Sequence, residues 1–155
     1  MEKETILREL KTRFGNERKE LGFKSTFEQI DEIFFVEDFI LKEGFVSNHL
    51  MRQISGRIIE TFHGWAGYLH NFVLPNPGNA VSVTENKLFS ESEKKEIWNV
   101  FKGCMDFSSK NSIIGLTKSK EEQTKFIDDS VGFWETLLKP KLTEIMNKVN
   151  SEWGK

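Results

Sequence analysis

One side of a predicted helix over residues 48–73 gathers two of the three histidines and a carboxylate. A helix turns by about 100° per residue, and this places seven residues, named the polar strip below, on one side. They are Gly56, Glu60, His63, Gly64, Gly67, His70 and Asn71. Titratable groups on a sheltered face are how acid, base and ligand-binding roles are built. The pattern therefore makes Glu60, His63, Gly64, Gly67, His70 and Asn71 candidate binding residues.

Glu60 and His63 stand three positions apart, as in one arm of a di-iron site. Such a site needs a second pair of this kind and two more carboxylates, and neither His49 nor His70 follows an acid at that spacing. A single ion held by Glu60, His63 and His70 would need a fourth ligand from elsewhere. We therefore expect neither a metal nor a cofactor.

Arg57 and His63, with five residues between them, carry a sharper catalytic hypothesis. This order resembles the signature of HEPN-superfamily ribonucleases and their nucleotidyltransferase-associated relatives. These are small helical bundles, often dimeric, in which the Arg and the His meet at the dimer cleft and act on RNA. Ile58 stands where that family usually has a polar residue, commonly Asn. On an unbroken helix the two side chains lie about 120° apart, so a joint role needs a kink near Gly64 or a partner subunit.

The three glycines of the polar strip need an explanation, because each costs about 1 kcal/mol relative to Ala inside a helix. One interpretation is that a neighbouring helix or another subunit crosses the strip closely and that the histidines are structural. The other is that the glycines form the floor of a pocket lined by Glu60, His63 and His70. The two differ in whether these side chains line a concave, solvent-connected pocket or are sealed under another helix.

The helix with the polar strip is one of about five that the apolar spacing predicts. The predicted ranges are 3–14, 25–44, 48–73, 90–114 and 119–153. Gly15 and Asn16 are predicted to end the first helix, which residues 17–24 can resume, and Pro140 to kink or split the last. Residues 75–89, with two prolines and several asparagines, predict a long connection. We expect an all-α, single-domain bundle over residues 1–155.

Charge and cysteine content narrow the function classes. The net charge of −2 removes the general attraction to nucleic acid that a basic domain has. The charged N-terminal sequence predicts neither a signal peptide nor a membrane span. The single cysteine, Cys104, fits a reducing compartment, so we expect a cytoplasmic protein, and its apolar helix face predicts a buried, inert thiol.

Residues 44–80 contain only three charged residues, Arg52, Arg57 and Glu60. A charge-poor helix is either central to a bundle or shared at an interface. We therefore expect an interaction or assembly module that acts through the helix of residues 48–73, as a homodimer or with another protein partner, rather than an enzyme. The alternative is an enzyme or ligand-binding protein that uses Glu60, His63 and His70, with Arg57, Glu60 and His63 as candidate catalytic residues.

Overall fold

The computed structural model describes residues 2–155, and within that range every regular element is a helix. The elements are α1 (Lys3–Leu21), α2 (Phe27–Phe34), α3 (Val36–Glu43), α4 (Leu50–Val73), α5 (Ala80–Asn86), α6 (Glu91–Thr117), α7 (Lys120–Phe133), the π-helical turn η1 (Trp134–Leu138) and α8 (Lys139–Trp153). The predicted all-α class is confirmed. The predicted count of about five is too low: with α7, η1 and α8 taken as one continuous helix, there are seven in the described range.

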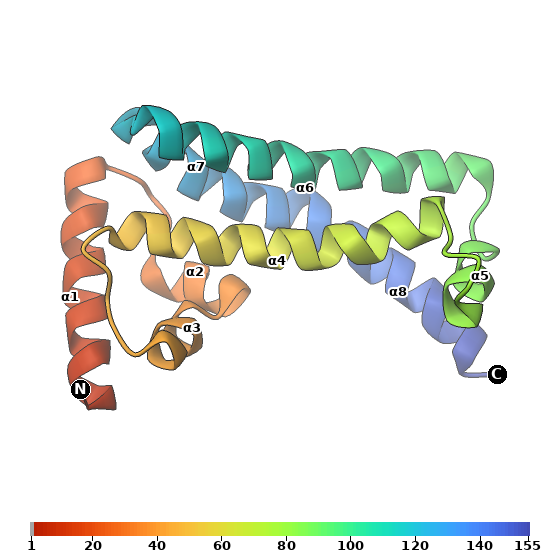
Figure 1. The fold of residues 1–155 in the computed structure, drawn as a ribbon, viewed down its shortest axis with the longest axis horizontal. Helices are drawn as coiled ribbons and strands as arrows, with labels where there is room; N and C mark the ends of the chain where they lie inside the picture. The colour runs from red at the N-terminus through yellow and green to blue at the C-terminus, as the bar shows by residue number, and fades with distance from the viewer. Residues whose placement is uncertain (1) are drawn as a thin grey trace.

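Helix α4 runs along the length of the molecule, and α6 lies antiparallel beside it (Figure 1). The continuous helix of α7, η1 and α8 crosses behind them. Helix α1 stands across one end of α4, close to α2 and α3, and α5 lies near the C-terminus at the other end. None of the helices in residues 2–155 has the length and apolar character needed to cross a membrane.

The core is centred on the apolar stripe of α4. Its fully buried members are Leu50, Ile54, Ile58, Phe62, Leu69 and Phe72. The ring of Phe62 lies 5.7 Å from that of Phe34 and 5.4 Å from that of Phe133, which ties α2 and α7 to α4. Trp65, predicted on the same stripe, is only partly buried, because its turn of α4 faces a groove. Cys104 is buried as predicted, and burial raises the pKa of its thiol to about 12.

The helix predicted over residues 25–44 is two helices, α2 and α3. Phe35 between them has a left-handed φ of 53°, and the Asp31 carboxylate accepts a hydrogen bond of 2.8 Å from the backbone N–H of Glu37. This conformation is unfavourable for a bulky residue. Apolar residues on both sides of the break keep the helical spacing, so the pattern gives no sign of it.

Residues 75–89 are not one long loop, because α5 forms within them. The Asn79 side chain accepts a hydrogen bond of 3.1 Å from the backbone N–H of Ser82 and so caps the helix. The buried Glu85 carboxylate accepts hydrogen bonds from the Tyr68 hydroxyl and from the Trp153 indole N–H, the latter at 2.8 Å. These bonds fix α5 to α4 and to the C-terminal helix.

Two further expectations concern where helices end. The first helix does not stop at Gly15; it continues to Leu21 and ends at Gly22, whose φ is 82°. A single glycine was too weak a signal, because the turn after it is held by Arg18, which donates hydrogen bonds to the carbonyls of Lys24 and Ser25. The predicted interruption at Pro140 takes the form of η1, since Pro140 has no N–H to donate one turn back and the helix widens instead of ending.

The link between α1 and α2 is held by Asp128 of α7. Its carboxylate accepts hydrogen bonds from the backbone N–H groups of Lys24 and Ser25, both at 2.9 Å, and from the Ser25 hydroxyl at 2.7 Å. Burial would raise the pKa of Asp128, but these hydrogen bonds lower it overall. The start of α2 is thereby fixed relative to the helix that leads into η1.

Candidate functional site

The three titratable residues of the polar strip face three different neighbours. Glu60 pairs with an arginine of its own helix, whereas Nε2 of His63 lies 2.7 Å from Oγ of Ser108 on α6. The ring of His70 lies 5.6 Å from that of Phe101. The three side chains do not converge on one point. Within residues 2–155, no three His, Cys, Asp or Glu side chains lie together as metal ligands would.

Arg57 and His63, the pair that resembles the ribonuclease signature, also face different ways. Nε of Arg57 donates a hydrogen bond of 2.6 Å to the carbonyl of Phe34, and its Nη1 lies 3.6 Å from the Glu60 carboxylate. His63 lies on the α6 side of the helix, and α4 stays helical through Gly64. A joint reaction of the two side chains would therefore need a second subunit.

The glycines of the polar strip are not packed closely against another helix within residues 2–155. A Cβ atom added at Gly56, Gly64 or Gly67 would meet nothing within 4 Å. Helix α6 contacts His63 and His70 of the strip, but at the three glycines the closely packed helix that the sequence left open as an explanation is not found in the described part of the chain. Any close approach at these glycines has to come from another molecule.

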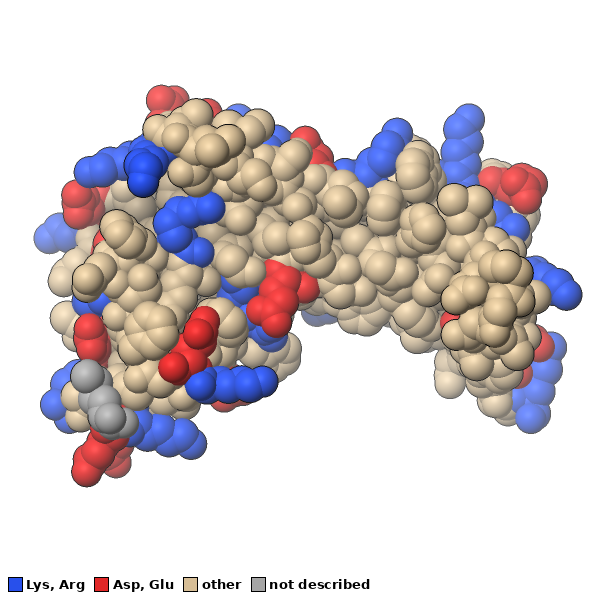
Figure 2. Space-filling view, in the orientation of Figure 1, with Lys and Arg blue, Asp and Glu red and all other residues tan. Residues whose placement is uncertain are grey.

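On its α6 side, the polar strip continues into an exposed apolar ridge. Trp98, Met105 and Leu116 are 37%, 41% and 83% exposed, and their spacing along α6 points them in nearly the same direction. We name the combined surface the α4–α6 face; its members are Gly56, His63, Gly67, His70, Trp98, Phe101, Met105, Ser108, Ser112 and Leu116. Figure 2 shows a largely uncharged band over α4 in the middle of the molecule, with charged side chains along the upper edge, where α6 lies, and at both ends.

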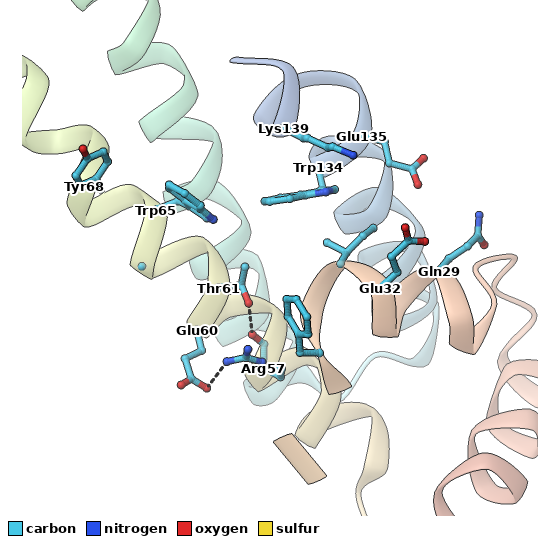
Figure 3. A pocket seen from close by; sticks show the side chains of 13 residues that line it. Gln29, Glu32, Arg57, Glu60, Thr61, Trp65, Tyr68, Trp134, Glu135 and Lys139 are labelled. Atoms are coloured by element: carbon cyan, nitrogen blue, oxygen red, sulfur yellow. Dashed lines mark hydrogen bonds and ion pairs between the residues drawn. The ribbon is translucent and has the colours of Figure 1, made fainter. Parts of the chain in front are cut away.

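The other side of α4 borders a groove of about 740 Å³ between α2, α4 and η1. Its aromatic lining comes from separate elements: Trp65 and Tyr68 from α4, Trp134 from η1 and Phe35 from the α2–α3 link (Figure 3). The polar lining residues are Gln29, Glu32, Arg57, Glu60, Thr61, Glu135 and Lys139. Of the polar strip, only Glu60 and Gly64 line this groove.

Only some of the charged side chains around the groove form ion pairs. Arg57 is bound to Glu60 and to a backbone carbonyl, as described above. Glu32, Glu135 and Lys139 form no ion pair with any residue in 2–155. Burial and the nearby Glu85 carboxylate raise the pKa of Tyr68, which keeps the hydroxyl protonated as a donor to Glu85.

Comparison of the chain with protein-family models, with curated proteins and with solved structures finds no significant match. The two flanks of α4 are therefore interpreted from their geometry and chemistry alone.

Proposed function

We propose that this protein is an assembly module whose α4–α6 face binds a second copy of the chain. The observation that carries the proposal is that one face presents both a row of exposed apolar side chains on α6 and glycines on α4 with open space above them. The three apolar side chains stand in line, about two and three turns apart along α6, and large apolar surface left exposed often marks a binding site. The expected interaction through the helix of residues 48–73 is thus extended to include α6.

The α4–α6 face is suited to pair with itself. In a twofold dimer the same patch is used by both copies, so it must contain both projections and depressions. Trp98, Met105 and Leu116 are the projections. The surface over Gly56 and Gly67 is the depression, because glycines let another backbone or a large side chain come close.

The size and charge of the face agree with a second copy as the partner. Helix α4 has 24 residues, so it is about 36 Å long, and two helices side by side offer a face of roughly 650 Å². Two copies would bury roughly 1,300 Å² in total, within the range of specific interfaces. The net charge of −2 causes little repulsion between copies. Two cations border the face: Arg52, whose guanidinium bonds Asn111 of α6, and the exposed Lys102, one turn from Trp98 and from Met105.

Analytical ultracentrifugation at micromolar concentration tests the proposal with Met105→Glu. A carboxylate buried without a partner costs several kcal/mol, so we expect the dimer dissociation constant to rise about 100-fold or more. Val81→Glu on α5 is the matched control, because Val81 is 52% exposed and lies outside the face. A wild-type chain that stays monomeric at high micromolar concentration would overturn the proposal.

Gly67→Ala distinguishes an effect on dimer association from an effect on the stability of α4. The added methyl group has open space in the single chain, so the monomer should gain about 0.5–1 kcal/mol of stability from better helix propensity. The same methyl group should weaken the dimer by holding the two copies apart. Gly15→Ala on α1 is the control, since it also has open space and should stabilise the chain without changing association.

A further inference from the structure

We propose that the groove between α4 and η1 is a binding site for an organic cation, a molecule that joins a quaternary or protonated ammonium head to an apolar body. This inference concerns the opposite flank of α4 and does not rest on the proposed dimer.

The walls of the groove have the chemistry that holds such a head group. The rings of Trp65 and Trp134 extend into the groove from opposite elements, α4 and η1 (Figure 3). Cations bind over aromatic faces, and tryptophan binds them best. The volume of about 740 Å³ is within the usual range for sites that take small molecules.

The charges of the groove favour a cation over an anion. Arg57 already donates to the Phe34 carbonyl and pairs with Glu60, so its charge is largely satisfied. The remaining ionised groups are the carboxylates of Glu32 and Glu135 and the ammonium of Lys139. In Figure 3 both carboxylates and the Lys139 ammonium lie on the side of the groove where Trp134 stands, which leaves two negative charges against one positive charge there. An ammonium group over the Trp134 ring would therefore have an excess of negative charge nearby.

Two unusual backbone segments meet at this groove. Phe35 adopts its left-handed conformation while its ring stays 56% exposed, although the adjacent Phe34 is fully buried. Trp134 and Glu135 are the first residues of the π-helical turn. Strained residues and π-helical turns are found preferentially at functional sites. Here they contribute two of the aromatic side chains that line the same groove.

The experiment is an NMR titration with choline, and with 3,3-dimethylbutan-1-ol as its neutral isostere. The chain has four tryptophans, whose indole N–H signals report on different places. We expect choline to shift the signals of Trp65 and Trp134 but not those of Trp98 and Trp153, and to bind about 10-fold more tightly than the alcohol. Equal affinity for the two compounds, or no shift of Trp65 and Trp134 at tens of millimolar choline, would overturn the proposal.

Variants of the exposed groove carboxylates test the charge argument without disturbing the core. Glu32→Gln combined with Glu135→Gln should weaken choline binding several-fold and leave alcohol binding unchanged. Glu121→Gln, an exposed carboxylate on α7 outside the groove, is the control. Trp134→Ala should weaken choline binding about 10-fold. If the double variant binds choline as well as wild type does, the groove is not a cation site. Met105→Glu should leave choline binding unchanged, so failure of the dimer and failure of this site give different results.

Discussion

The two flanks of α4 differ in shape, charge and backbone regularity. Towards α6, two regular antiparallel helices present an open face with few charges. Towards η1, a left-handed residue and a π-helical turn border a groove with aromatic walls and charged rims. One glycine-rich helix thus contributes to both surfaces, and its neighbours decide which kind each becomes.

The difference follows from helix geometry. Two regular helices that pack along their length leave a broad, nearly flat surface, which suits another macromolecule. A concave site for a small molecule needs elements that diverge. In this protein the divergence occurs where α2 ends at Phe35 and where α7 widens into η1. Irregular backbone is therefore what points to the proposed small-molecule site, and exposed apolar side chains on regular helices are what point to the proposed interface.

The largest predicted effect is a loss of stability, and it should differ between a core residue, Phe62, and a residue of the groove wall, Trp65. Phe62 is fully buried among aromatic rings, so Phe62→Ala should cost about 3–5 kcal/mol of unfolding free energy. Trp65 is only partly buried, so Trp65→Ala should cost less than about 2 kcal/mol. Urea unfolding measures both. Equal losses would mean that Trp65 is a core residue and that the groove is not open in solution.

A smaller effect is expected at Gly103, on a side of α6 that another helix covers. A Cβ atom there would lie 2.7 Å from Cε1 of Phe133, and that ring is held 4.9 Å from the ring of Phe107. Gly103→Ala should therefore destabilise the chain by about 1–3 kcal/mol. Gly64→Ala, where space is open, should stabilise it by about 0.5–1 kcal/mol. Changes of the same sign at the two positions would remove the contrast between covered and open glycines.

Much of the fold was predictable because helix formation is largely local. The apolar spacing identified the helix of residues 48–73 closely, as α4 (Leu50–Val73), although its N-cap is His49, which makes no side-chain cap hydrogen bond. The break at Phe35 was not predictable, since it depends on an Asp31 side chain that bonds the backbone two residues beyond the break. Helix α5 was missed because its stability comes from distant partners of Glu85 rather than from apolar spacing.

The candidate site was less predictable than the fold. The spacing along one helix grouped Glu60, His63 and His70. It could not show that the two histidines contact α6 whereas Glu60 lines the groove on the other side of α4. One further signal was present in the sequence. Trp98, Met105 and Leu116 are large apolar residues that fall outside the apolar stripe of their own helix, which indicates that they are exposed. Trp134 falls on the apolar spacing of the last helix, and nothing local shows that η1 turns it towards a groove.

The smallest predicted effect is that of His63→Ala on the single chain. Its imidazole is exposed, and its one side-chain partner, the Ser108 hydroxyl, can bond to water instead. The net worth of such a hydrogen bond is at most about 1 kcal/mol, so His63→Ala should change the unfolding free energy by less than that. The measurement belongs in the Met105→Glu background, where association does not add to the apparent stability.

Ser108→Ala and the double variant complete a thermodynamic cycle around this hydrogen bond. If the α4–α6 face is open in the monomer, the coupling between His63 and Ser108 should be well under 1 kcal/mol. A loss of about 2–3 kcal/mol on His63→Ala alone would mean that its partner is left unpaired in a buried site. In that case something of this chain covers the face, and a second copy could not bind there. In the wild-type background, His63→Ala measures the contribution of this side chain to dimer formation. Because His63 lies within the proposed interface, its removal should change the dimer dissociation constant more than it changes the unfolding free energy of the single chain.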